Sequence, residues 1–156
     1  MDITRHYIKQ FLSENKEPAE DLEYYKRKIL ANPENLEKVP EEFKTPELCK
    51  IAVEKDGSAL EYVPDELKTL ELCKIAVERN GYALLWVPDE LKTPEIYKIA
   101  AEKHIYALKY VPDELKTIEL CMIAVKRHSS ALEFVPDKLK TPEMCMIAVK
   151  KDGYTL

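Results

Sequence analysis

The fold is decided by one heptapeptide, Val63-Pro64-Asp65-Glu66-Leu67-Lys68-Thr69. It recurs unchanged at residues 87–93 and 111–117, and in altered form at residues 39–45 and 135–141. Each copy begins 24 residues after the one before. Because this spacing never drifts, we expect the copies to occupy equivalent places in a stacked array of structural repeats.

The period divides the chain into units that form one continuous domain. Residues 1–44 contain a degenerate unit, which predicts an N-terminal helical capping segment. The repeats follow at residues 45–68, 69–92, 93–116 and 117–140, with a partial unit at 141–156. Within the cap, apolar spacing predicts one helix over residues 1–15 and a second over 19–31.

Each unit has the pattern of a helix, a short helical segment and a turn. A threonine in the N-cap position is followed by proline in three of the five units, as suits a first helical turn. Val63-Pro64 ends the short segment, since a residue before proline avoids the α conformation. No stretch alternates as a strand does. The predicted core consists of these residues of the first unit and their equivalents in the others: Leu48, Ile51, Ala52, Leu60, Val63 and Leu67.

Glycine recurs where the long helix should end. Gly57, Gly81 and Gly153 are placed to stop it in the left-handed conformation. Ile105 and Ser129 occupy the same place in the other two units. We therefore predict that those two helix ends are strained or differently shaped.

The run from Val63 to Leu84 resembles the helical repeats catalogued as domain of unknown function 4116. The resemblance covers residues 33–156. It implies tandem helical units of a kind that occurs in bacterial proteins, including secreted effectors, and it brings no established activity or catalytic residue. The period is also similar to that of leucine-rich-repeat-variant proteins, which are right-handed solenoids. The predicted fold is thus an all-α, right-handed α-solenoid, with the handedness taken from that likeness alone.

Composition limits the functional classes. The net charge is −5 and no basic block stands out, so nucleic acid is an unfavoured partner. No apolar run approaches the roughly 20 residues that span a bilayer, and the first residues lack the apolar core of a signal peptide. We expect a cytoplasmic, reducing compartment, with delivery into a host cell left open by the family resemblance.

Two columns of equivalent residues could in principle bind metal. Cys49, Cys73, Cys121 and Cys145 share one column, in which Tyr97 takes the remaining place. Successive units lie about 8 to 10 Å apart, too far for a disulfide or a shared ion, so buried free thiols are expected. His104 and His128 share another column with Asp56, Asn80 and Asp152, and by the same argument we expect helix-end side chains there rather than a metal site.

Aromatic residues form two further columns. Tyr62, Trp86, Tyr110 and Phe134 directly precede the Val-Pro pairs and are interpreted as packing at the core margin, with a stacking ladder for a single strand as the alternative. The other column varies from unit to unit, which marks positions that packing does not constrain: Ser58, Tyr82, Tyr106, Ser130 and Tyr154.

These patterns favour a non-enzymatic scaffold that binds a protein or peptide and uses no cofactor or metal. The oligomeric state is open, with a monomer favoured. The alternatives are a structural spacer within a larger protein and, more weakly, a binder of single-stranded nucleic acid. The predicted partner-binding residues are Asn80, Tyr82, Leu85, Trp86, His104, Tyr106, Lys109 and Tyr110.

Overall fold

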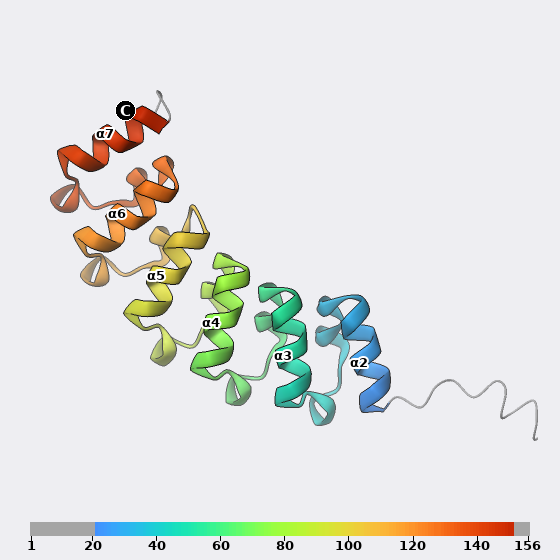
Figure 1. Cartoon of the computed structure of the whole chain (residues 1–156). Coiled ribbons are helices and arrows are strands. Elements are labelled where there is room, and N and C mark those ends of the chain that lie inside the picture. The colour runs from blue at the N-terminus through green and yellow to red at the C-terminus, as the bar shows by residue number, and fades with distance from the viewer. Residues whose placement is uncertain (1–20, 152–156) are drawn as a thin grey trace, which may run out of the picture.

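The computed structural model describes residues 21–151, which form a curved array of stacked helical units (Figure 1). The α-helices each have ten residues and are α2 (Leu22–Ala31), α3 (Pro46–Lys55), α4 (Leu70–Arg79), α5 (Pro94–Lys103), α6 (Ile118–Arg127) and α7 (Pro142–Lys151). Within this range no residue is in a strand. The predicted helical repeat solenoid is confirmed, whereas its handedness stays a prediction.

The short segment of each unit is a 3₁₀-helix rather than an α-helix. These helices are η1 (Pro33–Lys38), η3 (Gly57–Tyr62), η5 (Gly81–Trp86), η7 (Ala107–Tyr110) and η9 (Ser129–Phe134). A second, one-turn 3₁₀-helix follows in each unit and lies along the outer side of the arc in Figure 1: η2 (Glu41–Phe43), η4 (Asp65–Leu67), η6 (Asp89–Leu91), η8 (Asp113–Leu115) and η10 (Asp137–Leu139). The prediction of a 3₁₀ turn there is confirmed.

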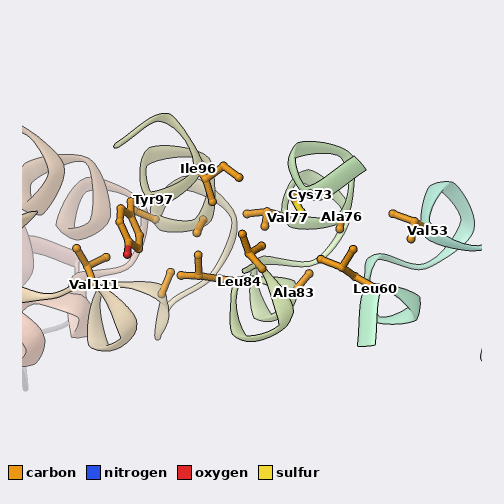
Figure 2. Close-up of a cluster of buried hydrophobic side chains, with 14 of the residues drawn as sticks. Val53, Leu60, Cys73, Ala76, Val77, Ala83, Leu84, Ile96, Tyr97 and Val111 are labelled. Atoms are coloured by element: carbon orange, nitrogen blue, oxygen red, sulfur yellow. The ribbon is translucent and has the colours of Figure 1, made fainter. Parts of the chain in front are cut away.

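The core lies between a row of α-helices and a row of the longer 3₁₀-helices, as Figure 2 shows for the middle of the array. Each inner α-helix contacts the α-helices before and after it and the 3₁₀-helix of its own unit, and α3, α4 and α5 also contact the 3₁₀-helix of the preceding unit. Two columns of alanine, fully or almost fully buried, line these contacts: Ala52, Ala76, Ala100, Ala124 and Ala148 in the α-helices, and Ala59, Ala83, Ala107 and Ala131 in the 3₁₀-helices. Such small side chains let successive backbones approach closely.

The predicted core is confirmed for four of its six columns. Leu48, Ala52, Leu60 and Val63 are buried, as expected. Ile51 and its equivalents are only half-buried, and the leucine of the one-turn helix is half-buried in three units. In the third unit Leu115 is 45% exposed, so the prediction that this leucine plugs the core is wrong there.

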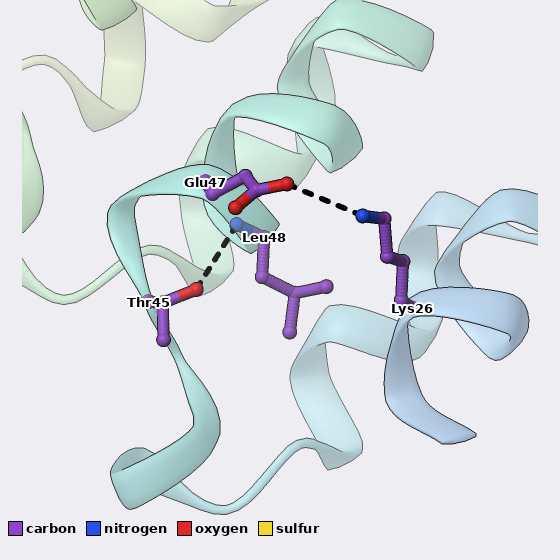
Figure 3. Close-up of polar contacts among 4 residues, drawn as sticks. All are labelled: Lys26, Thr45, Glu47 and Leu48. Atoms are coloured by element: carbon purple, nitrogen blue, oxygen red, sulfur yellow. Dashed lines mark hydrogen bonds and ion pairs between the residues drawn. The ribbon is translucent and has the colours of Figure 1, made fainter. Parts of the chain in front are cut away.

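Threonine begins each α-helix after the first, as predicted. In α3 the Thr45 hydroxyl accepts a hydrogen bond from the Leu48 backbone N–H at 3.2 Å (Figure 3). The same bond is made in the later units at 3.1 to 3.4 Å. Each bond satisfies a backbone donor that the helix leaves unpaired. Figure 3 also shows Lys26 of α2 reaching Glu47 of α3, 3.2 Å away.

The lysine that precedes each threonine is held within its own turn. Lys68 pairs with Asp65 at 2.8 Å, and the equivalent pair forms in the other units at 2.7 or 2.8 Å. The lysine side chains are largely covered, with 8 to 34% of their area exposed, while the acidic partners are exposed. The heptapeptide thus closes its turn by an ion pair as well as by backbone hydrogen bonds.

The predicted role of the glycines is wrong for Gly57 and Gly81. No described residue has a positive φ, and each of these glycines begins a 3₁₀-helix. The structure requires glycine because space is lacking. A Cβ atom on Gly57 would lie 2.2 Å from the Ala76 carbonyl oxygen of the next unit. Gly153 lies outside the described residues.

The two units without this glycine differ from each other. Before Ile105, α5 ends like the other α-helices, with the His104 backbone N–H donating to the Ala100 carbonyl oxygen, so the prediction of a different helix end is wrong there. What differs is the next element, since η7 does not begin until Ala107. At Ser129 the 3₁₀-helix begins as it does at the glycines, and the prediction fails.

The N-terminal capping region shows helix α2 where the second helix is predicted, while the helix predicted over residues 1–15 lies outside the described residues.

Replacing Gly57 by alanine should lower the free energy of unfolding by roughly 1 to 3 kcal/mol, because the added methyl group overpacks the contact with α4. Urea unfolding followed by far-UV circular dichroism measures this loss. Glu61→Ala, at an exposed site of the same 3₁₀-helix, is the control and should change the value by no more than about 0.5 kcal/mol. Equal effects of the two substitutions would contradict the steric explanation.

The thiols should react unequally. Cys49, Cys73 and Cys121 are buried and free, and burial raises the pKa of Cys49 and of Cys73 to about 11. Cys145, in the terminal α7, is half-buried. With an aromatic disulfide reagent at neutral pH, we expect one thiol to react more than about tenfold faster than the rest. The Cys145→Ser variant should lose this fast phase, and a fast phase that survives would contradict the assignment.

Candidate partner-binding surface

The eight predicted binding residues fall into two groups. The first group, Asn80, Tyr82, His104 and Tyr106, lies where an α-helix passes into a 3₁₀-helix. The second group lies within the 3₁₀-helices, with Leu85 and Trp86 in η5 and Lys109 and Tyr110 in η7. Tyr154, the last member of the varied column, lies outside the described residues.

Asn80 holds the chain at the start of η5. Its side-chain oxygen accepts a hydrogen bond from the Tyr82 backbone N–H at 3.0 Å. Its amide nitrogen donates to the Ser58 hydroxyl of the preceding unit at 2.7 Å. Both ends of the side chain are therefore engaged, and Asn80 contributes to the surface by fixing Tyr82 and by joining two units.

His104 occupies the equivalent position one unit later. Its Nδ1 atom accepts a hydrogen bond from the Tyr106 backbone N–H at 3.1 Å, which requires Nδ1 to be unprotonated. Burial, and to a smaller extent the charge of His128, lower the pKa of His104 below its ordinary value of 6.5. At neutral pH the imidazole is therefore neutral and can hold the Tyr106 backbone as Asn80 holds that of Tyr82.

Four rings form a continuous aromatic ridge across three units, consisting of Tyr82, His104, Tyr106 and Phe134. The ring centroids of Tyr82 and His104 lie 3.6 Å apart, and those of His104 and Tyr106 lie 5.8 Å apart. Tyr106 meets Phe134 edge to face at 5.9 Å. Tyr82 and Tyr106 remain 37% and 43% exposed. The ridge thus offers aromatic surface that is already fixed in position.

Two residues of the second group, Leu85 and Trp86, border a hollow apart from the aromatic ridge. Leu85, which is 46% exposed, and the half-buried Trp86 line a cavity of about 450 Å³. Its other walls include the ion-paired turns Asp65–Lys68 and Asp89–Lys92. In the part of the chain that the structure describes, no ring of this group contacts the aromatic ridge. Leu85 and Trp86 therefore form a second patch, whereas Lys109 and Tyr110 follow Tyr106 in η7.

The column of aromatic residues before the Val-Pro pairs does not form a stacking ladder. Tyr62, Trp86 and Phe134 pack against the core, which confirms the interpretation of these residues as core-margin packing. Tyr110 is exposed. Among the described residues no two members of the column stack on each other, and Phe134 contacts Tyr106 of the varied column instead. Phe134 could not be placed in the site from the sequence, because a repeat pattern does not reveal contact between two different columns.

No group of three or more His, Cys, Asp or Glu residues able to hold a metal ion occurs between residues 21 and 151. In the same range no helix is long and apolar enough to cross a membrane. The ridge, with its exposed rings and backbone-fixed turns, is suited to contact with side chains or peptide groups of another molecule.

The geometry defines a tandem-repeat helical solenoid with an exposed aromatic ridge. A family model described as "Domain of unknown function (DUF4116)" matches residues 21–68, 69–116 and 117–156. The chain belongs to this family. Each of the first two matches spans two of the 24-residue units defined by the heptapeptide. No curated protein and no solved structure matches the chain.

The histidine of the ridge should make stability depend on pH. Because the folded-state pKa of His104 lies below 6.5, the unfolded chain binds more protons and the free energy of unfolding falls as pH drops below about 6.5. His104→Asn supplies the cap used at Asn80 and should reduce this fall between pH 7 and pH 5. Urea unfolding at pH 7 and pH 5, for both proteins, measures this difference in the free energy of unfolding.

His128 is expected to leave a residual dependence, since burial and the charges of Lys151 and Arg127 lower its pKa as well. Hydrogen bonds and charge from their lysine partners lower the pKa values of Asp89, Asp113 and Asp137. Their protonation therefore lowers the free energy of unfolding only below about pH 4. An unchanged pH dependence in His104→Asn would contradict the assignment to His104.

Proposed function

We propose that this protein is a non-enzymatic scaffold that binds a peptide or protein surface along the aromatic ridge. The observation that carries the proposal is the contact of four rings across three units. Two of these rings, Tyr82 and Tyr106, are exposed. Folding requires the alanine and leucine columns but not these rings, since serine occupies the place of Tyr82 and Tyr106 in two other units. The rings are therefore available for recognition.

The arrangement supports binding because it is preorganised. Hydrogen bonds from the backbone to Asn80 and His104 fix the turns that carry Tyr82 and Tyr106. Binding then orders few additional side chains, which keeps its entropic cost low. Tyrosine is also enriched among the residues that contribute most binding free energy at protein interfaces. Lys109 and Tyr110 are exposed on η7 and extend this surface, since the Lys109 backbone N–H donates a hydrogen bond to the Tyr106 carbonyl oxygen.

The family resemblance supports placing such a scaffold in a bacterial protein, including effectors delivered into a host cell. Its role there would be to hold a partner rather than to transform it. The net charge of −5 and the absence of a basic block favour a protein or peptide over nucleic acid as that partner.

The proposal is tested with the triple variant Tyr82→Ala, Tyr106→Ala and Lys109→Ala. A partner captured by affinity purification from cells and then purified should bind the variant at least about tenfold more weakly, because aromatic anchors dominate interface energies. Binding is measured by isothermal titration calorimetry, and helical content by circular dichroism should not change.

The matched control changes Ser130, Glu61 and Glu133 to alanine, at the same repeat positions in other units. It should bind the partner normally. Equal loss in both variants, or normal binding by the ridge variant, would refute the ridge as the binding surface. Binding of labelled oligonucleotides at low salt that depended on the ridge would instead favour the nucleic-acid alternative.

A further inference from the structure

A groove between α5 and α6 differs from the equivalent grooves elsewhere in the array. It encloses about 450 Å³, and its apolar wall includes Tyr97, Leu115, Leu120 and Ile123. The groove of the same kind between α3 and α4 encloses about 140 Å³, and the one between α2 and α3 about 70 Å³. One junction of the α row is thus much more open than two others built from the same repeat positions.

Two residues distinguish this junction. Tyr97 replaces the cysteine found in the other units and is buried, its ring lying between α5 and Val111 in Figure 2. Leu115, whose equivalents Leu67, Leu91 and Leu139 are half-buried, is 45% exposed and lines the groove. Because a tyrosine needs far more volume than a cysteine, the junction has less room for the leucine of the next turn, which remains at the surface.

Among the described residues, an ion pair bridges two other junctions but not this one, nor the α3–α4 junction, where Lys50 pairs with Glu54 of its own helix. Lys26 pairs with Glu47 across α2 and α3, and Lys74 pairs with Glu95 across α4 and α5 at 2.6 Å. The equivalent residues at the α5–α6 junction are Lys98 and Glu119, which both line the groove. Within residues 21–151 they form no ion pair with each other, so Glu119 is left available to a ligand at the mouth of the groove.

The mouth is acidic. Three glutamates and one lysine line it, and Glu95 is already paired with Lys74. Glu114 and Glu119 are exposed and, within the described range, have no ion-pair partner. An apolar pocket bordered by free carboxylates favours a ligand that combines a large apolar group with positive charge.

We propose that the α5–α6 groove binds a basic peptide segment by accepting one leucine or phenylalanine side chain against Tyr97, Leu115 and Ile123. Lysine or arginine residues beside this anchor pair with Glu114 and Glu119. The volume lies within the range of about 300 to 1,000 Å³ that is usual for ligand pockets. The groove is built from elements other than those of the aromatic ridge, so the two proposals stand independently.

The test uses the full chain with labelled leucine and isoleucine methyl groups, observed by NMR. The probe is a short synthetic peptide with a central leucine between pairs of lysine or arginine. We expect shifts centred on Leu115, Leu120 and Ile123. The same peptide with central alanine, or with glutamate in place of the basic residues, should bind at least about tenfold more weakly. Shifts centred elsewhere, equal binding of the three peptides, or no shifts at low millimolar concentration would refute the proposal.

Two variants test the groove itself. Glu114→Lys with Glu119→Lys should weaken binding of the basic peptide at least about tenfold, whereas Glu66→Lys with Glu71→Lys, at the same repeat positions of the α3–α4 junction, should change it less than about twofold. Equal losses of affinity in the two double variants would show a general charge effect and refute the proposed site. Tyr97→Cys restores the residue used in the other units and should narrow the groove. Retention of full binding by Tyr97→Cys would also overturn the proposal.

Discussion

The structure depends on close contact between successive units through small side chains. The two alanine columns and Gly57 bring each backbone against the next, to the point that a single Cβ atom would collide with the Ala76 carbonyl oxygen. Because every unit must present the same contact to both neighbours, the 24-residue spacing cannot vary. The Thr N-caps and the Lys–Asp turns serve this requirement by starting and closing each unit at a constant place.

One kind of departure from the repeat lies at places that this contact leaves free. The varied column carries serine or tyrosine at the α to 3₁₀ junction, and Asn80 or His104 supports it with equivalent hydrogen bonds. The exchange of cysteine for Tyr97 is different, since it occurs inside the core and is accompanied by an exposed Leu115. The residues of the varied surface column form the ridge, whereas the groove lies beside Tyr97, a core residue that differs from its equivalents.

Most of the fold follows from the sequence because its causes are local. Threonine at the N-cap, proline in the first turn and the Val-Pro pair each act within a few residues, so helix boundaries could be predicted closely. The role of Gly57 could not, because the atom that excludes a side chain belongs to Ala76 in the next unit. The site shows the same division. Exposure of Tyr82 and Tyr106 could be inferred from variation between units, whereas the Tyr106–Phe134 contact and the α5–α6 groove depend on distances between units.

The third unit concentrates several irregularities. Its 3₁₀-helix has four residues instead of six, Tyr97 takes the place of cysteine in its core, and Leu115 is exposed beside the next α-helix. In a solenoid the total stability is close to a sum of unit and nearest-neighbour terms, so these features lower the stiffness of one joint without weakening the others. Bending of the array should therefore concentrate at the α5–α6 joint, which would behave as a compliant hinge between two stiffer arms. One arm carries Tyr82, and the other carries Phe134 at the far end of the ridge.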